Sequence, residues 1–164
     1  HHPGDSPLKV LTYGNDLMSY VLRVTQNSPK QYRFTFITRL QNLTMDVVEL
    51  MLLANNIYVT KANITTTAEK RLSYQHQALS KLQALNYFSK KKKKYQAITF
   101  KHATQINKQG IICIQYLQAW IKSDRSRYQK IYASLSWLFW NGHTLTLGGH
   151  RREFLASVGR QQLL

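Results

Sequence analysis

The chain has 164 residues, enough for one domain with a hydrophobic core, and its 43% of hydrophobic residues excludes an intrinsically disordered protein. Its 23 Lys and Arg residues oppose only 7 Asp and Glu residues, so the net charge is +16. A polycation of this kind attracts polyanions, and nucleic acid is the expected partner.

The first expected helix follows a short leading segment. Residues 1–12 begin with His-His-Pro-Gly, and we interpret them as a disordered lead-in or a tag remnant. Residues 13–26 carry one apolar stripe at helical spacing, formed by Leu17, Val21 and Val24. The Asn-Ser-Pro sequence that follows ends this helix and offers an N-cap serine and a first-turn proline to the next one.

The next two helices are long and amphipathic. The second, over residues 29–58, has an apolar stripe formed by Leu40, Leu43, Val47, Leu50 and Ala54, flanked by Phe34, Ile37, Val48 and Leu52. The third begins at a cap, either Asn63 or one of residues 65–67, and reaches about Phe88. Its expected buried residues are Leu72, Leu79, Leu82 and Leu85.

The five consecutive lysines at 90–94 connect the third helix to a fourth, over residues 99–123. The expected buried residues of this helix are Ile106, Ile111, Ile114, Leu117 and Ile121. Four long helices joined by short loops predict an all-α fold, an up-down-up-down four-helix bundle over residues 13–124. Residues 125–164 are basic and aromatic, and we expect them to form a C-terminal extension.

Two observations concern the cellular setting. No apolar run approaches the about 20 residues that span a bilayer, and no secretory signal pattern opens the sequence, so we expect no membrane partner. Cys113 is the single cysteine, which excludes an intrachain disulfide and favours a reducing, cytoplasmic compartment. Its neighbours Ile112 and Ile114 predict a small, buried apolar side chain.

The positive charge is concentrated in the second part of the chain. Residues 1–70 carry 7 basic and 5 acidic side chains, whereas residues 71–164 carry 16 basic and 2 acidic ones. A solvated helix surface normally interleaves both signs, so this surplus indicates a binding surface. The candidate phosphate-binding residues are Arg71, Lys81, Lys90, Lys91, Lys92, Lys93, Lys94, Lys101, Lys108, Lys122, Arg125, Arg127, Lys130, Arg151 and Arg152.

Tyrosines are interleaved with these cations. They suit stacking on unpaired bases, and half-buried packing in the bundle is the alternative; the residues concerned are Tyr87, Tyr95, Tyr116, Tyr128 and Tyr132. For the lysine run the alternative is a solvated loop. No groove-reading motif occurs, so we expect salt-sensitive binding with little sequence preference.

Residues suited to catalysis or metal binding are scarce. Asp46 and Glu49 share a helix face, where such a pair more often forms salt bridges with basic neighbours. His143, His150 and Cys113 lack the spacing of a metal motif such as CxxC or HExxH. We therefore expect no catalytic residues, no metal and no cofactor, and a protein that is not an enzyme.

Several segments resemble one family of small four-helix bundles. The stretch from Asn27-Ser28-Pro29-Lys30 to Arg33-Phe34, with Val48-Glu49-Leu50 and Ala54, resembles its first two helices. Leu117-Gln118-Ala119-Trp120 resembles the end of its last helix, and Lys81 falls where its third helix often carries a basic residue. The family contains the accessory variability determinant (Avd) of diversity-generating retroelements and proteins encoded in ribosomal-RNA intervening sequences. The resemblance covers residues 13–124.

The resemblance implies a function without catalysis. Avd-like proteins are basic homopentamers that associate with the reverse transcriptase of the element and with its template RNA, and they support mutagenic synthesis of cDNA. This predicts a homo-oligomer that binds RNA, and possibly cDNA, together with a reverse transcriptase. The alternative is a structural bundle of the intervening-sequence type that binds nucleic acid nonspecifically. A third class, an enzyme such as a nuclease, requires clustered carboxylates that the sequence does not offer.

Overall fold

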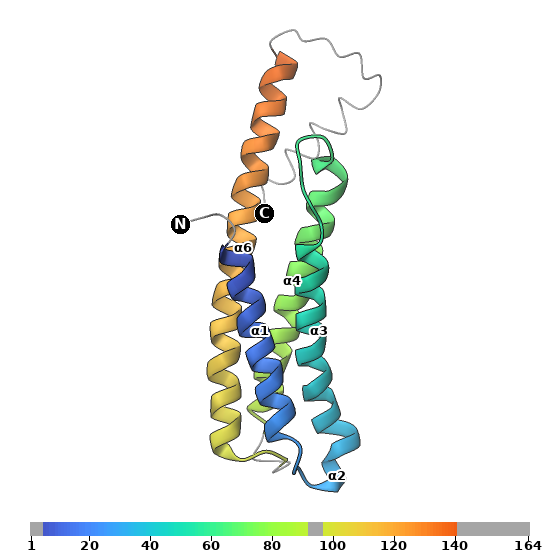
Figure 1. Cartoon of the computed structure of the whole chain (residues 1–164), viewed down its shortest axis with the longest axis vertical. Helices are drawn as coiled ribbons and strands as arrows, with labels where there is room; N and C mark the ends of the chain where they lie inside the picture. The colour runs from blue at the N-terminus through green and yellow to red at the C-terminus, as the bar shows by residue number, and fades with distance from the viewer. Residues whose placement is uncertain (1–4, 92–96, 141–164) are drawn as a thin grey trace. The chain divides into compact units, whose positions relative to one another are not determined.

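The computed structural model describes residues 5–91 and 97–140, and every regular element in those ranges is helical (Figure 1). The chain divides between Asp124 and Arg125 into two compact units. Four long helices build the first unit: α1 (Asp5–Val24), α3 (Thr38–Asn55), α4 (Ile64–Ser89) and the first part of α6 (Phe100–Trp140). The prediction of an all-α four-helix bundle is confirmed.

The four helices form a closed ring in the order α1, α3, α4, α6. Helix α3 packs against both α1 and α4. Helix α6 contacts both α1 and α4 and so completes the circle of helices. The aromatic side chains of Tyr13 on α1 and Tyr116 on α6 have centroids 4.6 Å apart, and Ser89 Oγ on α4 donates to Asn107 Oδ1 on α6 at 3.0 Å. Neighbouring helices run antiparallel, and α3 and α6 stand diagonally opposite each other (Figure 1).

The core follows alternating three- and four-residue steps, the spacing of left-handed helix bundles. Helix α4 contributes Ile64, Ala68, Arg71, Gln75, Ala78, Leu82, Leu85 and Ser89. Helix α6 contributes Ala103, Ile106, Cys113, Leu117 and Trp120, which confirms the predicted burial of Cys113. Gly110 continues this line, and a Cβ at that position would lie 2.2 Å from Asn86 Oδ1, so glycine permits α6 to approach α4 closely.

The first two predicted helices differ from the structure in their bounds. Helix α1 begins at Asp5, and Val10 lies fully buried in the core, so the expected lead-in over residues 1–12 is wrong from residue 5 onward. The second helix is divided into α2 (Lys30–Tyr32), a π-helical turn η1 (Arg33–Ile37) and α3. Within α3, Met51 occupies the core position expected for Leu50, which is half-buried.

Helix α6 continues to Trp140, although the sequence predicted an end at residue 123. Neither proline nor glycine occurs between Gly110 and Gly142, so nothing in this stretch breaks a helix. In the second unit, the part of α6 after Asp124 buries Tyr128 and Tyr132. Over residues 5–91 and 97–140, no helix has the length and apolarity needed to cross a membrane.

Candidate nucleic-acid interface

One end of the bundle collects exposed cations. It is formed by the end of α1, the α2–η1 segment, the end of α4 and the start of α6, at the bottom of Figure 1. Because the helices alternate in direction, segments distant in sequence meet there. We call this region the basic end; its exposed cations are Arg23, Lys30, Arg33, Lys90, Lys91 and Lys101. Lys92, Lys93 and Lys94 lie outside the described residues.

Acidic residues are absent from the sequence that builds the basic end. None occurs between residues 17 and 45, 70 and 91, or 97 and 123. The acids of the bundle with a described environment lie nearer its middle and opposite end: Asp16, Asp46, Glu49, Glu69 and Asp124. Among the described residues, the positive field at the basic end is therefore not offset by a nearby acid, which favours a polyanionic ligand.

The backbone at the basic end is held by side-chain contacts. Arg33 Nε donates to the carbonyl oxygen of Ser28 at 2.9 Å, and the Thr38 hydroxyl donates to the carbonyl oxygen of Arg33. These bonds brace the π-helical turn at both sides. The Lys91 ammonium lies 4.7 Å from the centre of the Tyr87 ring, a cation–π contact that joins a charge and an exposed ring.

The outward face of α6 carries further lysines. Lys101, Lys108 and Lys122 are all exposed, and their spacing in multiples of seven residues places them on one side of the helix. Between Lys108 and Lys122 this face also exposes Ile112 and Ile111, so the predicted burial of Ile111 is wrong. The middle of α6 thus combines positive charge with apolar surface, whereas Lys101 belongs to the basic end.

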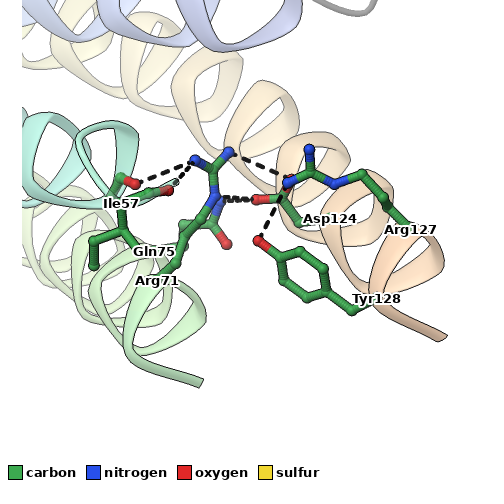
Figure 2. Close-up of polar contacts among 7 residues, drawn as sticks. Ile57, Arg71, Gln75, Asp124, Arg127 and Tyr128 are labelled. Carbon is green, nitrogen blue, oxygen red and sulfur yellow. Dashed lines mark hydrogen bonds and ion pairs between the residues drawn. The ribbon is translucent and has the colours of Figure 1, made fainter. Parts of the chain in front are cut away.

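Two predicted phosphate-binding residues are engaged within the bundle. Lys81 Nζ lies 3.2 Å from Asp46 Oδ2, and both side chains are roughly one-third exposed, so this carboxylate offsets the lysine charge. Arg71 is buried, and its Nε donates to Asp124 Oδ2 at 2.7 Å (Figure 2). The prediction of Arg71 as a surface cation is wrong, because the residue lies on the core line of α4.

Arg71 instead joins three helices near the end of the bundle opposite the basic end. Its Nη1 donates to the carbonyl oxygens of Ala54 at 3.3 Å, in the last turn of α3, and of Ile57 at 3.0 Å, just after the helix. Gln75 Nε2 donates to Asp124 Oδ2 at 2.8 Å (Figure 2). The guanidinium carbon also lies 5.1 Å from the ring centre of Trp120. These contacts of Arg71 stabilise the packing of the helices.

The second unit adds three exposed cations on α6, namely Arg125, Arg127 and Lys130. The Arg127 guanidinium carbon lies 5.2 Å from the centre of the Tyr128 ring. Arg151 and Arg152, which the sequence also assigned to phosphate binding, fall in residues 141–164 and so outside the described part of the chain.

The predicted stacking tyrosines divide into two groups. Tyr87 is 58% exposed, whereas Tyr116 packs half-buried on Tyr13, and Tyr128 and Tyr132 are buried. Tyr95 lies outside the described residues. Sequence reasoning missed two exposed rings at the basic end, Phe34 and Phe100. Phe34 was assigned to the flank of an apolar stripe, and only the π-helical turn reveals that it faces solvent.

Groups with reactive chemistry do not converge in the described ranges. There, no cluster of three or more His, Cys, Asp and Glu residues is placed to hold a metal ion. Burial, with a smaller contribution from Asp16, raises the pKa of the Cys113 thiol to about 12. The thiol is therefore protonated at neutral pH and is a poor nucleophile. His143 and His150 lie outside the described residues.

No protein-family model matches the chain, and comparisons with curated proteins and with solved structures find no match.

Proposed function

We propose that this protein is a non-catalytic accessory subunit of a diversity-generating retroelement, which binds template RNA or cDNA and the reverse transcriptase. The basic end is the observation that carries the proposal. Its cations come from four segments of the chain, they are exposed, and no acid lies in the sequence that surrounds them. Phosphates bound there release counterions, so affinity depends on charge and salt and little on sequence.

The proposal includes a homo-oligomer, a pentamer in the family that the chain resembles. Two outward faces support self-association. The face of α3 exposes Met45, Leu52 and Leu53 around the carboxylate of Glu49, and the face of α6 exposes Ile111 and Ile112 between Lys108 and Lys122. One face is apolar and acidic and the other is apolar and basic. Because α3 and α6 are diagonal in the bundle, these complementary faces lie on different sides of the subunit, so identical copies can associate head to tail, which forms a ring where the rotation between neighbours closes.

The central test removes charge at the basic end. We expect the triple variant Lys90→Gln, Lys91→Gln, Lys101→Gln to bind RNA more weakly, and the slope of log affinity against log salt to fall by about 2, because each lost phosphate contact in a single strand contributes about 0.7. The matched control is Lys9→Gln, Lys61→Gln, Lys70→Gln, which removes equal charge from exposed lysines toward the opposite end. Filter-binding titrations over a salt series measure both.

Equal slopes for the two triple variants would show that net charge alone drives binding, and the basic end would lose its role. Association with the enzyme separates the retroelement subunit from a structural bundle of the intervening-sequence type. We expect a reverse-transcriptase gene and an adenine-mutated repeat pair beside this gene, and co-purification of that reverse transcriptase with the protein. A gene neighbourhood inside ribosomal RNA would favour the structural bundle.

A further inference from the structure

Three exposed aromatic rings share the basic end. Phe34 on η1 is 92% exposed, Tyr87 near the end of α4 is 58% exposed, and Phe100 at the start of α6 is 70% exposed. The exposed part of such rings forgoes the free energy that burial of apolar surface provides. The chain could bury aromatic rings here, because the neighbouring residues Phe36 and Phe88 pack against the core.

We infer that the basic end is a site for single-stranded nucleic acid, in which Phe34, Tyr87 and Phe100 stack on unpaired bases while the surrounding lysines bind phosphates. This inference rests on the proposed nucleic-acid function and adds the form of the ligand. Positive grooves with aromatic platforms are the general means of binding single strands without sequence preference, since every base offers a π-face.

The π-helical turn explains the position of Phe34. A π turn has a wider hydrogen-bonding register than an α turn, so it shifts the residues that face the core. Ile37 is buried and Phe36 is half-buried, whereas Phe34 points to solvent. The bonds from Arg33 to Ser28 and from Thr38 to Arg33 fix this turn, so the ring is presented by an ordered backbone. Such pre-organisation lowers the entropy cost of binding.

At the end of α4 a positive charge also lies next to an exposed aromatic side chain. The Lys91 ammonium, 4.7 Å from the ring centre of Tyr87, places a phosphate-binding group beside a base-stacking group. A nucleotide presents its phosphate and base with a similar adjacency, and the absence of acids in residues 70–91 leaves the phosphate unopposed. In a double helix the bases stack on each other and are closed to these rings, so a duplex gains only the phosphate contacts.

The test compares a short unstructured RNA, a duplex of equal length, and an oligonucleotide with the same phosphates but abasic sugars. The aromatic variant is Phe34→Ala, Tyr87→Ala, Phe100→Ala, and the control is Tyr58→Ala, which removes an 83% exposed ring near the opposite end. Stacking contributes about a tenfold affinity per base. We expect the aromatic variant to bind the unstructured RNA at least about 100-fold more weakly, and the duplex and abasic strand as tightly as the parent protein does.

The outcomes separate the inference from the function on which it rests. If the parent protein binds all three probes equally, or if the aromatic variant loses affinity for all three equally, stacking is refuted while phosphate binding stands. If the parent protein binds none of them at low salt, the proposed function itself fails. Thermal unfolding by circular dichroism verifies that the variants fold; should the triple variant unfold, the single variants Phe34→Ala and Phe100→Ala make the same comparison at about tenfold.

Discussion

At the scale of single residues, the bundle depends on a buried ion pair between Asp124 and Arg71, and sequence reasoning assigned Arg71 to the surface. Arg71 and Asp124 lie 53 positions apart, yet their bond joins α4 to α6 while Arg71 also reaches the end of α3. Removing both ions from water is costly, and the contacts from Gln75 and from the backbone carbonyls of Ala54 and Ile57 help to offset that cost. The pair is therefore more sensitive to the loss of one partner than to the loss of both.

We expect Asp124→Asn to lower the free energy of unfolding by about 3–5 kcal/mol, because it leaves the Arg71 charge buried without its counter-ion. Asp46→Asn is the control, since its partner Lys81 is partly exposed, and there we expect a loss of about 0–1 kcal/mol. Urea unfolding measures both. Replacing both partners, as Arg71→Met with Asp124→Leu, should restore part of the loss; equal losses for the two Asp→Asn variants would contradict this account.

The buried thiol of Cys113 is expected to make the free energy of unfolding depend on pH in the alkaline range. Its thiol has a pKa of about 12 in the folded protein, raised from 9.0. The folded chain keeps this proton between those values while the unfolded chain loses it, so stability is fully present below pH 9 and falls as pH rises toward 12. The loss amounts to about 1.4 kcal/mol for each pH unit in that window.

The comparison of parent protein and Cys113→Ala isolates this term, since other alkaline titrations are common to both. We expect the stability advantage of the parent over the variant to shrink as pH rises above 9 in urea unfolding series. In an independent test, the Cys113 thiol of the folded protein should react with a disulfide reagent only as fast as the protein opens. In the protein unfolded by urea, the same thiol should react at the rate of a free thiol. A constant advantage at all pH values would argue against the raised pKa.

At the scale of elements, the amphipathic patterns identified the four helices but not every register. In α4 the leucines at 72 and 79 suggested the buried face, yet they are half-buried, and the core line runs through Arg71, Gln75 and Ser89. Polar residues on that line break the apolar signal, although the alternation of three- and four-residue steps from Ile64 to Ser89 was present in the sequence. The burial of these groups depends on partners in α6, which are distant in sequence.

The lysines of the candidate site could be predicted from the sequence, but its exposed aromatic side chains could not. Lys90, Lys91 and Lys101 were identified because composition alone separates basic from acidic stretches. Phe34 and Phe100 were not, because exposure at a π-helical turn and at a helix start depends on how the backbone deviates from a regular α-helix. The end of α6 was missed for a related reason: a change in composition at Asp124 does not stop a helix when no proline or glycine follows at once.

At the scale of the whole molecule, association of subunits would bury the exposed apolar residues of α3 and α6 and pair the charges beside them. A single copy leaves Leu52 and Leu53 exposed on α3 and Ile111 and Ile112 exposed on α6. Such strips on diagonal helices suit a head-to-tail contact, in which Glu49 of one copy faces lysines of the next. Association of this kind would leave the basic end of each copy open to the proposed RNA ligand and would gather several basic ends, which would raise avidity.

Two variants test the head-to-tail contact. We expect Ile111→Ser with Ile112→Ser to impair the α6 face, and Leu52→Ser with Leu53→Ser to impair the α3 face, so that light scattering finds each protein smaller than the parent oligomer. When the two variants are mixed, each still offers one intact face, so they should pair into heterodimers and stop there. If only one of the two variants became smaller and the other kept the mass of the parent oligomer, the contact would join like faces. A parent protein that is monomeric at micromolar concentration would refute the proposed ring of subunits.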